Sequence, residues 1–178
     1  MNAYRYALLL TLGASLVGLA GCTTSRQESS TLSSADQTFL ENAAQGSYAE
    51  IRGSELAQDK TRSADVKAFA AAMIRDHTAA NQRLAALAAR KGYTPPTEPS
   101  VMQRAEITTL RALSGNAFDK MYVDRIGVAA HKATIEHFET AAASAQDRDV
   151  RAFARKLLPT LRHHLEMAEA LNQAQKSQ

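Results

Sequence analysis

The stretch SADVKAFAAAMIRDHTAANQRLAALAAR (residues 63–90) decides the fold. Alternating steps of four and three residues through it trace the stripe with which a helix packs on its neighbours. The apolar positions of this stripe are Val66, Ala70, Met73, Ala80, Leu84 and Leu87. The remaining position, in the middle of the stripe, is His77. Because a buried imidazole needs a polar partner, His77 predicts a polar layer inside a helical bundle.

The composition of the whole chain is typical of an all-α protein. Among its 178 residues there are only 8 Gly and 4 Pro, and strong helix formers such as Ala, Leu, Gln and Arg are common. The formal net charge is +3, from 21 basic and 18 acidic residues that form no block of like charge. This balance favours solubility and gives no indication of a nucleic-acid partner.

The first 22 residues have the pattern of an export signal. Arg5 precedes an apolar run at 7–20 that is too short for a permanent membrane span. The run ends in Leu19-Ala20-Gly21-Cys22, which resembles the bacterial lipobox, where a cysteine after small residues is lipidated. Cys22 is the only cysteine, so no internal disulfide can form. We predict a lipoprotein signal peptide at 1–21; the alternative is an ordinary secretory signal with an unrelated cysteine.

The segment after Cys22 predicts where the protein is anchored. Thr23, and not Asp, follows the cysteine, which in the lipoprotein sorting implied by this resemblance favours the outer membrane of a diderm bacterium, facing the periplasm. Residues 22–34 are polar and rich in Ser and Thr, which is typical of a flexible tether. The predicted partner of the chain is therefore the membrane, through lipidated Cys22.

Four long helical segments are expected after the tether. Besides the stretch at 63–90, they lie at 35–59, 117–145 and 149–173. A proline-containing linker and a short helix at 101–113 separate the second long helix from the third. Because this connection can span the length of a bundle, we predict an antiparallel, ferritin-like four-helix bundle at 35–173 with a long crossover between helices 2 and 3, followed by a short tail at 174–178. A simple up-and-down bundle with a capping helix is the alternative.

Each of the other long segments also has a polar residue on its apolar stripe. Glu50 lies on the first, Asp124 and His131 lie one heptad apart on the third, and His164 lies on the fourth. On the first segment a rival stripe runs beside the one that contains Glu50, so two orientations are open. The two competing stripes are Phe39, Ala43, Gly46, Glu50, Gly53 and Ala57, and Leu40, Ala44, Ser47, Ile51 and Ser54.

These polar residues leave two main arrangements of the core open, besides independent roles for the separate residues. The first is a metal site formed by Glu50, His77, His131 and His164, with Asp124 as a further candidate ligand. Imidazole and carboxylate ligands suit Cu, Zn, Fe or Ni. The second is a structural network, in which a carboxylate or carbonyl satisfies each imidazole and the contacts fix the register of the helices.

A ferritin-like di-iron centre is not expected. Such centres need Glu three residues before His on two helices. The residues at that spacing before the three candidate histidines are Ile74, Val128 and Leu161. The chain also lacks a Gly-rich phosphate loop, and its only thiol is assigned to the lipobox. Nothing else in the sequence indicates catalysis.

Several short motifs, in order and at consistent spacing, resemble the domain-of-unknown-function family 4142, a ferritin-like family of bacterial envelope proteins. They are Met73-Ile74-Arg75-Asp76-His77, Leu113-Ser114-Gly115 with Phe118-Asp119 and Tyr122, His131, and Leu158-Pro159-Thr160-Leu161 with His164-Leu165. The resemblance covers 36–171 and implies a ferritin-like fold and export, without an activity. Two functional hypotheses follow: a lipid-anchored envelope bundle with a structural or stress-related interaction role, and a periplasmic protein that binds or buffers a transition metal.

Overall fold

The computed structural model describes residues 32–177, and all regular structure in this range is helical. The predicted signal peptide, Cys22 and most of the tether lie outside the described residues. Three of the long helices and the short connecting helix are continuous: α1 (Ser34–Lys60), α2 (Ala64–Arg90), α3 (Val101–Ala112) and α6 (Arg148–Lys176). The remaining long helix has three parts: α4 (Gly115–Met121), the π-helical segment η1 (Tyr122–Ala129) and α5 (Ala130–Ser144).

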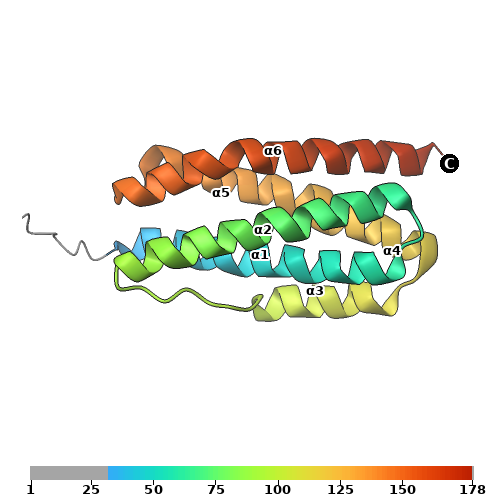
Figure 1. Cartoon of the computed structure of the whole chain (residues 1–178), viewed down its shortest axis with the longest axis horizontal. Helices are drawn as coiled ribbons and strands as arrows, with labels where there is room; N and C mark the ends of the chain where they lie inside the picture. Colours follow the sequence, from blue (N-terminus) through green and yellow to red (C-terminus); the bar gives the residue numbers. More distant parts are fainter. Residues whose placement is uncertain (1–31, 178) are drawn as a thin grey trace, which may run out of the picture.

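The helices form two antiparallel hairpins that pack side by side (Figure 1). One hairpin is α1 with α2, and the other is α5 with α6; α2 also packs on α6, and α1 on α5. Between α2 and α4 the chain runs back along the bundle, with α3 lying against α1. This connection carries the chain from one end of the bundle to the other. The predicted ferritin-like fold with a long crossover is thus confirmed.

The helix ends follow from local chemistry. The Ser63 hydroxyl accepts a hydrogen bond from the Val66 amide at 3.3 Å and caps α2. The Ser33 hydroxyl caps α1 by accepting a hydrogen bond from the Asp36 amide at 3.1 Å. Gly92 follows α2 with a φ of 69°, a left-handed conformation that glycine adopts at little cost. These ends fix the lengths of the helices that hold the central polar layer.

The buried face of α1 uses both of the competing stripes, one after the other. The first half buries the rival stripe, through Leu40, Ala44 and Ser47. The second half buries Glu50, Gly53 and Ala57, and Ser54 of the rival stripe beside them. An α-helix has about 3.6 residues per turn, so a stripe drawn with a period of 3.5 drifts around the helix over several turns. The drift explains why neither stripe alone describes the whole of α1.

The predicted stripe of the third long segment is wrong in its first half. Steps of four and three residues through Asp124 and His131 place Ala117, Met121, Asp124 and Val128 on the core side there. The fully buried residues are instead Phe118, Tyr122, Val123, Ile126 and Gly127, while Met121 and Val128 are half-buried at the edge of the same cluster. The π-helical segment η1 holds, in effect, one residue more than an α-helix of the same length. The faces before and after η1 are therefore out of step by one position, and the second half, with His131 and Phe138, is buried as predicted.

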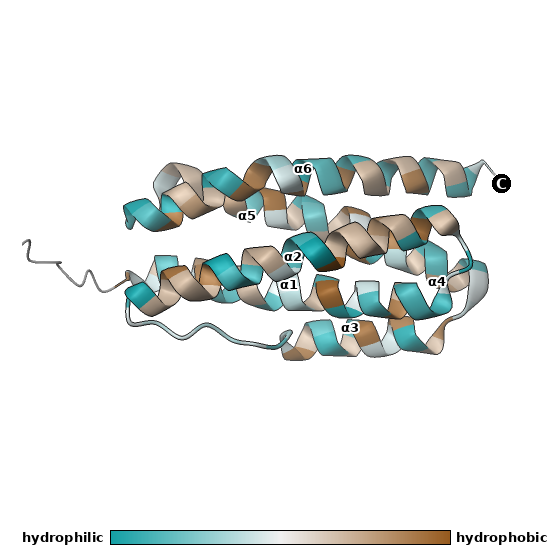
Figure 2. Cartoon of the chain, in the orientation of Figure 1, coloured by the Kyte–Doolittle hydropathy of each residue, from teal (hydrophilic) through white to brown (hydrophobic). Residues whose placement is uncertain are grey.

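Two apolar regions lie on either side of the central polar layer. One, near the turn between α1 and α2, contains Phe69, Phe118 and Tyr122. The other, toward the opposite end, is made by two clusters that include Leu84 and Phe138. Figure 2 shows a hydrophilic band in the middle of α2, between more hydrophobic stretches of the helix. Within residues 32–177, no helix has the combination of length and hydrophobicity that crossing a bilayer requires.

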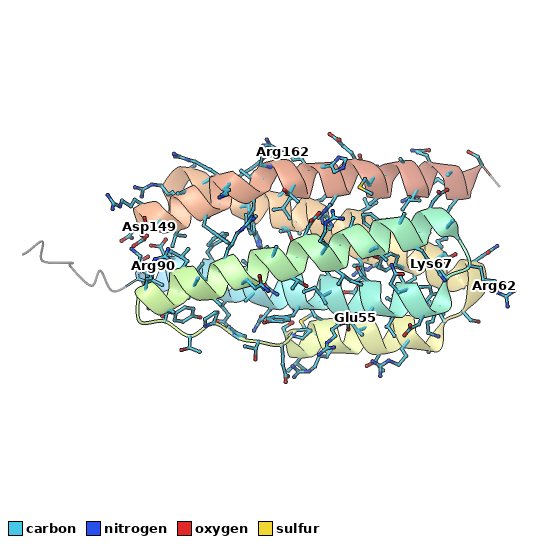
Figure 3. The ribbon with its side chains drawn as sticks, viewed as in Figure 1. Glu55, Arg62, Lys67, Arg90, Asp149 and Arg162 are labelled. Carbon is cyan, nitrogen blue, oxygen red and sulfur yellow. The ribbon has the colours of Figure 1, made fainter. Side chains whose placement is uncertain are left out.

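Charged side chains lie mainly on the outside of the bundle. Figure 3 shows Arg62 at one end and Arg162 on the outer side of α6, both pointing away from the core. Arg162 pairs with Glu139 at 2.7 Å, and both side chains are about half exposed. Such surface pairs contribute little to stability, so the charges that matter for function are those inside the bundle.

Candidate metal centre

Three histidines from three different helices meet in the centre of the bundle. His77 comes from α2, His131 from α5 and His164 from α6, and the centroids of their rings are 5.4–5.6 Å apart. A ring nitrogen of each lies within 4.8 Å of a ring nitrogen of the other two. The three residues are 4%, 0% and 1% exposed. The fold thus brings together the three histidines that the sequence singled out.

Glu50 on α1 contacts two of these histidines, in both cases at Nδ1, the ring nitrogen nearer to the main chain of the histidine. Its Oε2 is 3.0 Å from Nδ1 of His77, and its Oε1 is 3.7 Å from Nδ1 of His131. Ser47 also lies 3.3 Å from Nδ1 of His77. A carboxylate that accepts from the second nitrogen of an imidazole fixes the orientation of a metal ligand. Glu50, predicted as a ligand, therefore has the position of a residue that orients one.

His131 is held by a carbonyl that the π-helical segment makes available. The amide of Ala130 bonds to the carbonyl of Arg125, five residues back, and α5 then continues with bonds to the fourth residue back. As a result of this change in hydrogen bonding, the carbonyl oxygen of Ile126 accepts no amide of the helix. Nδ1 of His131 lies 3.2 Å from that oxygen and donates to it. The local unwinding of the helix thus supplies the acceptor that fixes the ring of His131.

His164 is held by Asp76, which the sequence analysis did not select. Nε2 of His164 lies 3.0 Å from Oδ2 of Asp76, on the neighbouring helix α2. Arg75 makes two hydrogen bonds to the same carboxylate, at 2.8 and 2.9 Å. Asp76 is adjacent to His77, and this position beside a stripe histidine was the signal available in the sequence. A residue next to a stripe faces the next helix of a bundle, here α6.

The hydrogen-bond partners leave one lone pair on each ring. Because His77 and His131 donate from Nδ1 and His164 donates from Nε2, the other nitrogen of each neutral ring is an acceptor. These nitrogens, Nε2 of His77, Nε2 of His131 and Nδ1 of His164, are buried and have no hydrogen-bond partner among residues 32–177. Three acceptors in so small a volume repel one another. A cation bound between the three nitrogens would remove this repulsion, and it would offset the cost of their missing hydrogen bonds.

Burial also sets the charge of the cluster. It lowers the pKa of His131 and outweighs the opposing effect of Glu50. It lowers the pKa of His164 to about 4, although Asp76 favours the charged form. Burial raises the pKa of Glu50, but the neighbouring His77 and His131 more than compensate and hold it below its ordinary value. At neutral pH His131 and His164 are therefore neutral, the form of imidazole that binds metals, and Glu50 is ionised.

The other candidate residues lie away from this centre. Asp124 accepts hydrogen bonds from Lys120 at 2.7 Å and from Asn172 at 2.6 Å, so it does not join the three histidines. Because η1 contains an extra residue, Asp124 does not lie on the buried face of its helix. His137 and His163 are exposed. The fold therefore separates three inner histidines from two outer ones.

Comparisons with known proteins add a family and a fold. The model of a family described as a domain of unknown function, DUF4142, matches residues 22–171. The chain belongs to the DUF4142 family. The resemblance that the sequence motifs indicated is thereby confirmed. No curated protein matches this DUF4142 chain.

A solved structure of similar fold is the crystal structure of a DUF305 fragment from Deinococcus radiodurans. It matches with a TM-score of 0.71 and 14% identity, over 80% of this chain and 98% of that chain. At this level of identity the two proteins share the fold alone. A functional proposal for the DUF4142 chain therefore rests on the arrangement of its three histidines.

Proposed function

We propose that this DUF4142 protein binds one transition-metal ion in the core of its bundle, through His77, His131 and His164. The observation that carries the proposal is the set of three buried, unpartnered nitrogens on neighbouring rings. A purely structural network would leave each of them unsatisfied, at a cost of about 1–3 kcal/mol per group. A metal ion accepts all three lone pairs at once.

The ligand set favours a late first-row metal. Imidazole suits Zn, Cu, Fe and Ni, and divalent affinity generally rises along the series to Cu²⁺. The three rings come with no thiolate and no bridging carboxylate, which favours Zn²⁺ or Cu²⁺ over a di-iron centre. Glu50 and Asp76 would orient His77 and His164 from outside the coordination sphere, as carboxylates commonly do for metal-binding histidines.

The proposed physiological role is the buffering or sequestration of a metal in the cell envelope. It combines the core site with the predicted export signal and lipid anchor on Cys22. The neutral state of His131 and His164 supports this role, because the ion need not displace a proton from either ring at neutral pH. Tight binding in a buried site and slow release suit storage better than turnover.

A metal titration tests the proposal. The full chain should carry Cys22→Ser, which removes its only thiol and thus a competing ligand. We expect one equivalent of Zn²⁺ or Cu²⁺ to bind in competition with a chelator, and to raise the unfolding free energy by about 4 kcal/mol at a thousand times Kd. His77→Ala should abolish this binding. His163→Ala is the matched control, because His163 is exposed and should leave it unchanged.

Two results would contradict the proposal. One is the absence of stoichiometric binding in the Cys22→Ser chain. The other is equal loss of binding in His77→Ala and His163→Ala, which would place the ion on surface imidazoles.

The proposed anchor is tested separately in cells. If Cys22 is lipidated, the wild-type protein should be found in the membrane fraction, and Cys22→Ser should move it to the soluble fraction. A Cys22→Ser protein that is still processed and membrane-bound would refute the lipid anchor, while leaving the metal proposal intact.

A further inference from the structure

A cavity with about 40 Å³ of solvent-sized free space lies beside the three-histidine cluster. His77, His164 and Glu50 line one part of it, and Asn81 lines another. The remaining walls include the apolar side chains of Leu84, Phe138 and Leu157. One solvent molecule needs roughly 10–15 Å³ of such space, so the cavity can hold a ligand of two or three heavy atoms.

Asn81 gives this cavity a polar wall that nothing in the fold explains. It lies four residues after His77 on α2, so both side chains are on the same face of the helix. Asn81 is only 9% exposed, and neither its Nδ2 nor its Oδ1 has a hydrogen-bond partner within residues 32–177. A buried amide without partners is costly, which indicates that it hydrogen-bonds to something in the cavity.

We propose that the cavity binds a water molecule or a small linear anion, which occupies the fourth coordination position of the metal ion and accepts a hydrogen bond from Asn81. This inference rests on the proposed metal site. Three imidazoles leave one position of a tetrahedral ion open, as in zinc sites with three protein ligands. Two of the three histidines line the cavity, so a ligand there lies next to the ion.

The charges and the walls define the class of ligand. Two carboxylates, Glu50 and Asp76, lie against the histidines, and Arg75 pairs with Asp76 at 2.8 Å. With a divalent ion the formal charges of these groups sum to +1, which attracts a monoanion. Nδ2 of Asn81 supplies a hydrogen-bond donor, and the apolar walls exclude large hydrated groups. Azide, a triatomic monoanion, has the size and charge that these features select.

The test uses the full chain with Cys22→Ser, loaded with Co²⁺, whose visible spectrum reports its ligands. Azide should shift the d–d bands with a saturable dependence on concentration. Asn81→Leu, which fills the polar end of the cavity with a side chain of similar size, should raise the Kd for azide by at least about tenfold. The affinity for Co²⁺ itself should change by less than about threefold, because Asn81 is not one of the clustered ligands.

A second substitution guards against misfolding of the first. Asn81→Ala removes the same hydrogen bond without adding bulk, and should also raise the Kd for azide by about tenfold. If Co²⁺ does not bind, both the metal proposal and this inference fail. If Co²⁺ binds and azide leaves its spectrum unchanged, only the fourth-position site is refuted. Equal azide affinity in wild type and both variants would refute the role of Asn81.

Discussion

The two hairpins of the bundle hold His77 and His131 in different ways. In the hairpin of α1 and α2, both helices are regular, and a carboxylate on the partner helix, Glu50, fixes His77 at 3.0 Å. In the other hairpin, the helix before His131 is unwound into η1, and a carbonyl of the same helix, that of Ile126, fixes the ring at 3.2 Å. A side chain thus holds His77, and the backbone holds His131. His164, also in the second hairpin, is held by a side chain again, the carboxylate of Asp76.

This difference shows how much of the proposed site depends on the shape of one helix. A carboxylate can reach His77 from α1 without any change in backbone geometry. The carbonyl of Ile126 is free for His131 only because the hydrogen-bonding pattern changes at Ala130. π-helical segments are rare and occur often at functional sites. We therefore expect η1 to serve the site and not the stability of the bundle.

The largest expected effect concerns pH, and it tests the environment of the second hairpin. The pKa of His164 is about 4 in the folded protein and about 6.5 in an unfolded chain. Between these values the unfolded chain binds more protons, so the unfolding free energy rises with pH. The metal-free protein should therefore have its full stability above pH 6.5, and should lose about 3 kcal/mol by pH 4. The lowered pKa of His131 acts in the same direction.

Urea unfolding of the metal-free full chain at several pH values measures this loss. His164→Phe should flatten the dependence between pH 4 and 6.5. His163→Ala, one residue earlier and exposed, should leave it unchanged. A pH-independent stability over this range in the wild type would mean that His164 is not a neutral buried ring.

A deletion in η1 tests the difference between the hairpins directly. Deleting Asp124 removes the extra residue that the π-helical segment contains. The segment can then form a regular α-helix, in which Phe118 and His131 still face the core. The carbonyl of Ile126 would then be used within the helix, and His131 would lose its acceptor. Loss of such an outer partner lowers metal affinity by about 10- to 100-fold.

Circular dichroism and a metal titration of the same deletion variant give the two readouts. Helix content and thermal midpoint should stay close to the wild type, while metal affinity falls. A deletion that leaves metal affinity intact would show that η1 has no part in the site. Deletion of Thr78 in the regular helix α2 is the contrasting case, and should disrupt the buried face and the fold.

The smallest expected effect is the change in the free energy of unfolding when one glycine in each hairpin is replaced by alanine. A Cβ on Gly127 in η1 would lie 2.9 Å from Cβ of Ala168 and 3.4 Å from the ring of Phe69. Gly127→Ala should therefore cost about 1–2 kcal/mol. Gly46 in α1 has only the end of the Gln103 side chain nearby, at 3.9 Å. Gly46→Ala should gain about 0.5–1 kcal/mol from helix propensity. Denaturant unfolding measures both changes, and equal effects would show that η1 is not packed more closely than α1.

The sequence was sufficient to predict the fold and the three histidines, because both depend on a regular helical period. His77 and His164 lie on stripes of continuous α-helices, and His131 lies on the part of its helix after η1. In each case the count of residues along the stripe leads to the buried face. The long connection before α4 then leaves few ways to arrange four helices.

The rest of the site depends on features that a regular period cannot describe. No residue type signals a π-helical segment, so the shift of one position that exposes Asp124 was not predicted. Asp76 lies beside its stripe, and its contact with His164 depends on how closely α2 and α6 approach. The position of Glu50 in the core was predicted correctly. Its contacts with Nδ1 of His77 and His131 depend on side-chain rotamers, which the spacing of residues does not determine.

The most direct test of the central claim is anomalous diffraction from crystals of the Zn²⁺-loaded protein. A three-histidine site predicts a single anomalous peak in the bundle core, about 2.0–2.1 Å from Nε2 of His77, Nε2 of His131 and Nδ1 of His164. It also predicts that Glu50 and Asp76 stay on the opposite nitrogens of their rings. A peak coordinated by Glu50 in place of an imidazole, or a core without any peak while surface histidines hold the ion, would contradict it.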